Sequence, residues 1–137
     1  MSENGFSIDR LRNILDGMGF QHAKIDGAIY AIFKGADFSK PLACVFIAGT
    51  NKIQAVGWEE GFSFDGSRRV EGLEFCNEWN YVKTNPRAYL DRDGDLRVDM
   101  TLFTDKPLTD EYVEENFARL FVSTAKQCYE EAAQKFG

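Results

Sequence analysis

The sequence predicts an α+β fold in which helices pack on an antiparallel sheet, with the element order α-β-β-β-β-α-β-β-α. Asp-Gly dipeptides at 26–27 and 93–94 each lie between runs rich in apolar residues, which is the pattern of a β-hairpin. Amphipathic stretches near both ends follow a Ser or a Thr, the residue types that cap helices. The chain contains no linker or repeat, so we expect residues 1–137 to form a single domain.

The first helix is expected to begin after Ser7, whose hydroxyl group can accept a hydrogen bond from the free N–H groups of the first turn. Phe6 and Leu11 stand at the spacing of a hydrophobic staple across that turn. One face of the helix is apolar and carries Ile8, Leu11, Leu15 and Met18. Gly17 and Gly19 predict its end.

Four strands are expected to follow as an antiparallel meander. We place them at residues 20–25, 28–34, 42–48 and 53–58, with a loop at 35–41 and a turn at 49–52. Asp26-Gly27 suits a type I′ turn, in which both residues need a positive φ. The third strand is apolar at every position, so it should be covered on both faces or paired deep in the sheet.

Residues 59–69 predict a mobile loop that holds two aromatic residues, Phe62 and Phe64. Ser67 is expected to cap a second helix that runs to about Lys83. The apolar residues of this helix spread over more than one face and are Val70, Leu73, Phe75, Trp79 and Val82. A helix that is apolar on two sides is usually clasped between other elements, so we expect both sides to be covered.

A second hairpin and a long helix complete the expected fold. Residues 87–91 and 95–103 flank Asp93-Gly94, for which we again expect a type I′ turn. Apolar and polar residues alternate along the second of these strands, so one of its faces should be buried. Thr109 is expected to cap a helix that reaches close to the C-terminus. Its apolar stripe consists of Val113, Phe117, Leu120, Phe121, Cys128 and Ala132.

Charge and residue counts argue against several classes of function. A formal net charge of −6 repels phosphate, so direct nucleic-acid binding is not expected. A single histidine, His22, argues against most zinc sites and His-based acid–base schemes. Cys44, Cys76 and Cys128 lack the spacing of a metal site, so we expect buried thiols in a reducing compartment, with a redox-sensing thiol as the alternative.

The sequence carries no sign of export, membrane insertion or catalysis. It shows no signal peptide and no apolar run near the ~18–20 residues of a membrane helix, so we expect a cytoplasmic protein without membrane contact. No motif marks a nucleophile or a phosphate-binding loop, and we predict no catalytic residue, no cofactor and no metal.

Four aspartates crowd the second hairpin and raise the question of calcium: Asp91, Asp93, Asp95 and Asp99. An EF-hand loop would need glycine and glutamate where this sequence has Leu96 and Leu102. We therefore favour a plain turn with solvated carboxylates and keep a weak cation site as the alternative.

Aromatic residues make up 14% of the chain, and some could form a partner surface rather than core. Trp58, Phe62 and Phe64 bracket a glycine-bearing segment and are candidates for an exposed patch, although we slightly favour that they close over the sheet. Phe121, Tyr129 and Phe136 widen the apolar stripe of the last helix, which suits contact with a dimer mate or a partner helix.

The segment Asn77-Glu78-Trp79-Asn80, followed by Pro86-Arg87-Ala88-Tyr89-Leu90 and the Asp93-Gly94 turn, resembles the signature of the YbjN family. The motif positions in this sequence are Asn77, Trp79, Asn80, Arg87, Tyr89 and Gly94. We expect structural roles for them: Trp79 anchors the helix, Asn80 bonds loop backbone near the helix end, and Arg87 pairs with a carboxylate across the hairpin.

The resemblance implies a fold like that of type III secretion chaperones and a bacterial sensory-transduction regulator without an agreed biochemical activity. We therefore expect a non-enzymatic, regulatory or chaperone-like protein that binds another protein. Two alternatives remain open: a secretion-type chaperone homodimer that binds an extended client segment, and a small enzyme or ligand-binding domain.

Overall fold

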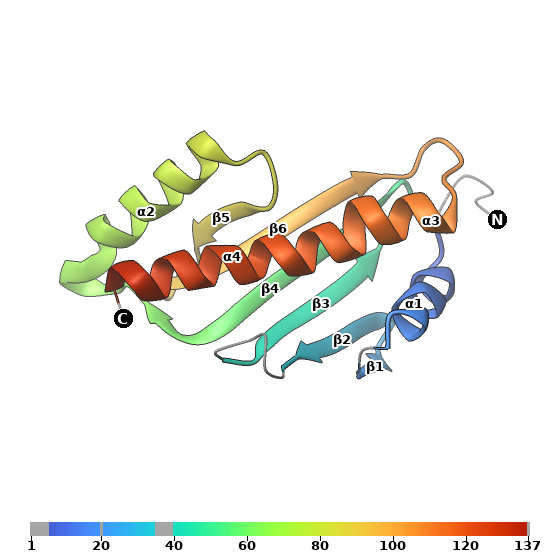
Figure 1. Cartoon of the computed structure of the whole chain (residues 1–137), viewed down its shortest axis with the longest axis horizontal. Coiled ribbons are helices and arrows are strands. Elements are labelled where there is room, and N and C mark those ends of the chain that lie inside the picture. The colour runs from blue at the N-terminus through green and yellow to red at the C-terminus, as the bar shows by residue number, and fades with distance from the viewer. Residues whose placement is uncertain (1–5, 20, 35–39, 137) are drawn as a thin grey trace.

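The computed structural model describes residues 6–19, 21–34 and 40–136. Within them, six strands form one antiparallel sheet in the order β1-β2-β3-β4-β6-β5, and the predicted α+β class is confirmed. The strands are β1 (His22–Ile25), β2 (Ala28–Phe33), β3 (Leu42–Ala48), β4 (Lys52–Ser63), β5 (Arg87–Leu90) and β6 (Asp95–Phe103). The helical elements are α1 (Ile8–Gly17), η1 (Gly66–Arg68), α2 (Arg69–Val82), α3 (Asp110–Val113), η2 (Glu114–Ala118) and α4 (Arg119–Phe136). Figure 1 shows α1 and α4 on the same face of the sheet, with α2 at the edge beside β5.

The N-terminal part of the fold follows the local signals in the sequence. Ser7 caps α1, because its Oγ accepts a hydrogen bond from the backbone N–H of Arg10 at 3.1 Å. At the first hairpin, Asp26 has a φ of 51° and Gly27 a φ of 79°, so the two positive angles of the predicted type I′ turn are confirmed. The apolar β3 lies between β2 and β4, as expected for a strand paired inside the sheet. Most of the loop predicted at 35–41, and the first residue of the strand predicted at 20–25, lie outside the described residues.

The prediction of a loop at 59–69 is wrong for its first part. β4 continues to Ser63, and its pairing with β6 shifts register between Trp58 and Ser63. Gly61 lies in this irregular stretch with a φ of +93°, a conformation that residues with a Cβ rarely adopt. The glycine that suggests a loop in the sequence thus bends a long strand. Beyond the bend, the chain buries Phe62 and Phe64 in the core.

Two expectations for the second helix are also wrong. Ser67 lies inside the short turn η1, and α2 has no side-chain cap at its N-terminus. The helix is covered on one side only, because it lies at the edge of the sheet beside β5. Its buried residues include Phe75, Cys76 and Trp79. The exposed apolar residues on its other sides are Val70, Leu73, Tyr81 and Val82.

The second hairpin forms where the sequence predicts it, but its turn is of another type. Gly94 has a φ of 87°, whereas Asp93 does not have a positive φ, so the type I′ prediction is wrong. The carbonyl of Asp91 accepts a hydrogen bond from the Gly94 N–H at 3.0 Å. Its side-chain Oδ1 accepts two more, from the N–H groups of Asp93 and Asp95 at 2.9 and 3.0 Å. The Asp91 side chain thereby stabilises a longer turn.

The C-terminal helical stretch runs from Asp110 to Phe136 and crosses the sheet (Figure 1). Thr109 caps it as predicted, accepting a hydrogen bond from the Tyr112 N–H at 3.1 Å. The π-helical turn η2, for which the sequence offers no signal, joins α3 to α4. No helix in the described part of the chain has the length and apolar content to cross a membrane.

The core lies between α4 and the sheet face beneath it. Phe121 of α4 packs edge-on against Phe46 of β3, with ring centroids 6.3 Å apart. The helix approaches β4 closely at Gly57, where an added Cβ would lie 3.1 Å from Cζ of Phe121. The phenolic OH of Tyr129 donates to the carbonyl of Leu96 at 2.6 Å and to that of Gly57 at 3.3 Å. α4 is therefore fixed to the middle of the sheet by both packing and hydrogen bonds.

Candidate functional site: the open face of the sheet

We call the surface of the sheet that points away from α1 and α4 the open face. Residues paired across neighbouring strands point to the same side, so the strand register assigns its members. The central row consists of Ala23, Tyr30, Val45, Val56, Asp99 and Arg87. The row on one side consists of Ile25, Ala28, Ile47, Gln54 and Thr101. The row on the other side consists of Ile32, Ala43, Trp58, Arg97 and Tyr89.

The part of the open face on β1, β2, β3 and β4, which we call the apolar half, is almost free of polar side chains. Of its residues in the three rows, only Gln54 and the hydroxyl group of Tyr30 are polar, and none is Asp, Glu, Lys, Arg or His. Tyr30 and Ile32 are 44% and 51% exposed. An antiparallel sheet with one face on the core normally carries polar residues on the other. The apolar half instead has the composition of a second core face, yet no helix of the described residues lies on it.

A hollow of about 620 Å³ opens at one end of the apolar half. Ile32, Ala43 and Trp58 supply its apolar side. Lys40 and Glu60 contribute the charged groups beside it. The apolar half therefore has a depression in which a side chain of another molecule could be seated.

The part of the open face on β5 and β6, which we call the charged half, is neutralised by its own ion pairs. Arg87 binds both carboxylate oxygens of Asp99, at 3.0 and 2.7 Å, and this hydrogen bonding raises the pKa of Arg87. The guanidinium group of Arg87 also lies over the ring of Tyr89, 4.9 Å from its centroid. Arg97 lies in the same way over Trp58, at 5.2 Å.

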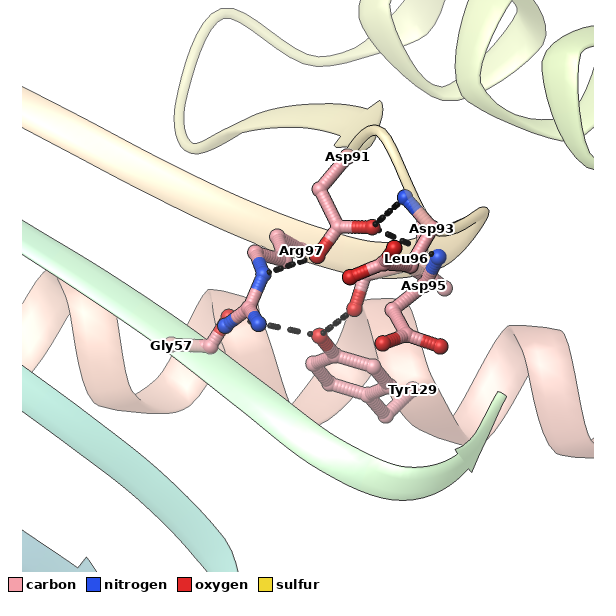
Figure 2. A network of polar contacts seen from close by, with 7 residues as sticks. All are labelled: Gly57, Asp91, Asp93, Asp95, Leu96, Arg97 and Tyr129. Atoms are coloured by element: carbon pink, nitrogen blue, oxygen red, sulfur yellow. Dashed lines mark hydrogen bonds and ion pairs between the residues drawn. The ribbon is translucent and has the colours of Figure 1, made fainter. Parts of the chain in front are cut away.

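The partner of Arg97 is Asp91 in the hairpin turn, shown in Figure 2. The Nε of Arg97 donates to Oδ2 of Asp91 at 2.7 Å, while Oδ1 accepts the turn N–H groups of Asp93 and Asp95. Burial would raise the pKa of the Asp91 carboxyl, but these hydrogen bonds outweigh it and lower the pKa.

The aspartate cluster is thus largely explained by the turn. Carboxylate oxygens of Asp91, Asp93 and Asp95 lie within 4.8 Å of one another, so the fold brings together three of the four aspartates that raise the calcium hypothesis in the sequence. Both oxygens of Asp91 are already engaged, by turn backbone and by Arg97. The expectation of solvated carboxylates is wrong for Asp91 and for Asp99, which is buried against Arg87. A cation at this cluster would have to compete with these hydrogen bonds for the Asp91 carboxylate.

The motif residues build the edge of the sheet next to this site. Trp79 is buried and its Nε1 donates to the carbonyl of Pro86 at 2.9 Å, which anchors α2 as expected. The side-chain amide of Asn80 donates to the carbonyl of Ala88 and accepts from its N–H, both at 2.9 Å. Asn80 thus pairs with strand β5, where we expected loop backbone, and it occupies hydrogen-bonding groups at the outer edge of that strand.

The other motif positions are explained in part. Arg87 pairs with Asp99 across the hairpin, as expected. A Cβ at Gly94 would lie 2.9 Å from the carbonyl oxygen of Phe64, so only glycine fits this approach. Asn77 is exposed on α2, and nothing in the structure explains its presence in the motif.

The six aromatic residues predicted as a partner surface do not form one. Phe62, Phe64, Phe121 and Tyr129 are buried, so an exposed patch is wrong for them, and the favoured closure over the sheet is confirmed for Phe62 and Phe64. β4 is longer than expected and carries Phe62 inward, and α4 turns Phe121 and Tyr129 towards the sheet. Phe136 is half-buried against Phe64, with ring centroids 4.9 Å apart. Trp58 alone of the six belongs to the open face.

The sequence reasoning missed the exposed members of the open face. They are Ile25, Tyr30, Ile32 and Ile47, with Phe103 at the end of β6. One signal for them was present: residues 42–48 are apolar on both faces, although the chain covers only one of them.

The thiols and the histidine offer no active site. All three cysteines are buried as expected, and burial raises the pKa of each thiol, that of Cys76 to about 11. Such thiols remain protonated at neutral pH and are poor nucleophiles. The Nε2 of His22 lies 2.6 Å from Oδ1 of Asp16, which joins β1 to α1.

Comparison with known proteins agrees with the motif. The family model of YbjN, described as "putative bacterial sensory transduction regulator", matches residues 7–134. A search of curated proteins gives no match. The matched region runs from the Ser7 cap of α1 to the last turn of α4 and so includes every strand of the sheet. The chain belongs to the YbjN family.

Proposed function

We propose that this protein is a non-enzymatic regulator that acts by binding another polypeptide through the apolar half of the open face. One observation carries the proposal: a sheet face of core-like composition is left uncovered by the described residues. Exposed apolar patches of this kind mark interaction sites on proteins. The family description as a regulator agrees with a binding role.

The buried thiols fit the same proposal. Three free cysteines with raised pKa values stay reduced most readily in a reducing compartment, so we place the regulator in the cytoplasm. The net charge of −6 and the ion pairing of the arginines in the charged half disfavour phosphate binding at the open face. The binding partner is therefore a protein rather than a nucleic acid.

A second candidate function is that of a secretion-type chaperone with the corresponding fold, which would bind an extended client segment. The position of β1 favours it, because β1 is the terminal strand on its side of the sheet. An extended segment could add to such an edge by backbone hydrogen bonds. The opposite terminal strand, β5, is blocked at Ala88 by Asn80.

Site-specific photocrosslinking in the cell of origin tests the main proposal. A benzoylphenylalanine in place of Tyr30 probes the apolar half, and the same group in place of Tyr81 is the control, because Tyr81 is 85% exposed on α2. We expect covalent adducts with a polypeptide from position 30 and none from position 81. An absence of adducts from position 30, in a folded protein, would contradict the proposal. Adducts from β1 positions alone would favour the chaperone function.

A further inference from the structure

The chemistry of the apolar half limits what can bind there. Its three rows contain no Asp, Glu, Lys, Arg or His, and the charged residues Lys52 and Glu60 lie at its two ends, so its centre offers no charge by which a charged partner could be selected. The neighbouring arginines are paired with Asp91 and Asp99 of the same chain. A basic partner attracted by the overall charge of −6 would find no acidic group in the three rows, because Glu60 lies beyond them, beside the hollow. The occupant that fits is another neutral, apolar surface.

The breadth of the open face favours a sheet over a single peptide segment. Six strands each about 4.8 Å wide and three rows each about 7 Å deep give a footprint of roughly 29 by 21 Å, or about 600 Å² before side-chain relief is counted. An extended peptide covers a strip only about 5 Å wide and would leave most of this surface in water. With side-chain relief, the accessible area approaches the ~800 Å² that each partner contributes to a standard interface.

A second copy of the chain supplies such a surface without any further assumption. Two-fold symmetry places the same patch on both sides of an interface, and sheets pack face to face about 10 Å apart with their strands within roughly 30°. With a two-fold axis parallel to the strands and close to β3, β2 of one copy lies over β4 of the other. The charged halves then fall outside the centre, where they form the polar rim that is usual for protein interfaces.

Building on the proposed function, we infer that the open face is the interface of a homodimer in which the two sheets pack face to face, with Tyr30, Ile32, Val45 and Ile47 at its centre. Each copy covers the apolar surface that the other leaves open. The interface excludes the charged half from its centre, so Arg87 and Arg97 keep their pairing with Asp99 and Asp91.

Analytical ultracentrifugation of the full chain, with the mass checked by light scattering, tests the inference. We expect a mass twice the 15.5 kDa of one chain at concentrations on the order of 100 μM. Ile32→Glu and Ile47→Glu each place an unpaired carboxylate at the interface in both copies, so the dissociation constant should rise by about 100-fold or more. Tyr81→Glu on α2 is the matched control and should leave it unchanged. Circular dichroism confirms that each variant is folded.

The salt dependence gives an independent readout. Two copies that each carry a charge of −6 repel one another, so raising NaCl from about 50 mM to about 500 mM should strengthen the dimer. A dimer that weakens with salt, or one that both glutamate variants leave intact, would overturn the inference.

A monomeric wild-type chain would also overturn the dimer inference. A dye-binding measurement then tests whether the proposed function still holds. If the monomer binds the apolar dye anilinonaphthalene sulfonate and Ile32→Glu abolishes this binding, the open face is free for a different protein and the proposed function stands. If the monomer binds no dye at this face, the proposed function fails together with the dimer.

Discussion

The two faces of the sheet are made from the same strands and have similar apolar residues, yet only one is covered. On β3, Cys44 and Phe46 are buried beneath α4, whereas Val45 and Ile47, which alternate with them, point to the open face. The covered face is defined by helix packing: Phe121 lies against Phe46, and α4 comes close to the sheet at Gly57. The comparison teaches that apolar side chains on a strand do not reveal which face its own chain will cover.

Truncating a side chain should show the largest difference in stability between the two faces. Phe121→Ala removes a fully buried ring from the covered face and should lower the free energy of unfolding by about 3–5 kcal/mol. Ile32→Ala on the open face removes a side chain that is about half exposed and should cost less than about 1 kcal/mol. Urea denaturation measures both, at a concentration low enough to avoid self-association. Equal costs would show that the open face is covered in the isolated chain.

Enlarging a side chain should also cost more stability on the covered face than on the open face. A Cβ at Gly57 would lie 3.1 Å from Phe121 and 3.3 Å from Val98, so Gly57→Ala should cost about 1–3 kcal/mol by pushing α4 away from the sheet. Ala43→Val adds two methyl groups on the open face, where we expect little change in stability. Thermal unfolding of the two variants measures the difference. A neutral Gly57→Ala would mean that α4 is not held tightly at this point.

Removing an ion pair from the charged half of the open face should lower the stability of the fold only slightly. Arg87→Met removes the partner of Asp99, which is only 7% exposed. Because the Arg87 side chain is itself 64% exposed, water replaces much of the lost interaction, and we expect a cost of about 1 kcal/mol. Arg92→Met, in the adjacent exposed turn, is the control. A loss above about 3 kcal/mol would show that the ion pair is more deeply buried than the structure indicates.

The last expected effect concerns pH and the carboxyl group of Glu59, at the end of the covered side of β4. Burial, opposed by Lys40 and aided by Glu130, raises the pKa of Glu59 to about 7. A raised folded-state pKa means that the folded chain binds the extra proton, so this contribution is present below about pH 4.5 and is lost as pH rises through about 7. Glu59→Gln should flatten the stability profile between these values. An unchanged slope in urea titrations would contradict the assignment.

Sequence signals identified the parts of the fold that depend on a few neighbouring residues. Ser7 and Thr109 cap their helices, and Asp26-Gly27 forms its predicted turn, because each interaction closes within three or four residues. The same dipeptide at Asp93-Gly94 misleads, since the Asp91 side chain and the close approach of Phe64 to Gly94 select another turn there. A local pattern predicts well only where no distant group competes with it.

The candidate site was largely beyond sequence reasoning. The sequence predicts structural roles for Trp79, Asn80 and Arg87. The structure confirms those of Trp79 and Arg87, whereas Asn80 bonds strand β5 and not loop backbone. Most of the aromatic residues that the sequence suggests as a surface are core, because the bent strand β4 carries Phe62 and Phe64 inward and α4 turns the aromatic residues of the last helix towards the sheet. The exposed residues of β2 and β3 were assigned to the sheet but not to a surface.

The sequence by itself determined the α+β class, the hairpins and the two helix caps, since these follow from periodicity and short-range hydrogen bonds. Tertiary structure alone decided which face of the sheet is covered. That choice depends on where α4 crosses the strands, and the crossing is fixed by Phe121 over Gly57 and by the hydrogen bonds of Tyr129 to strands far away in the sequence. The open apolar face is what this packing leaves without a cover.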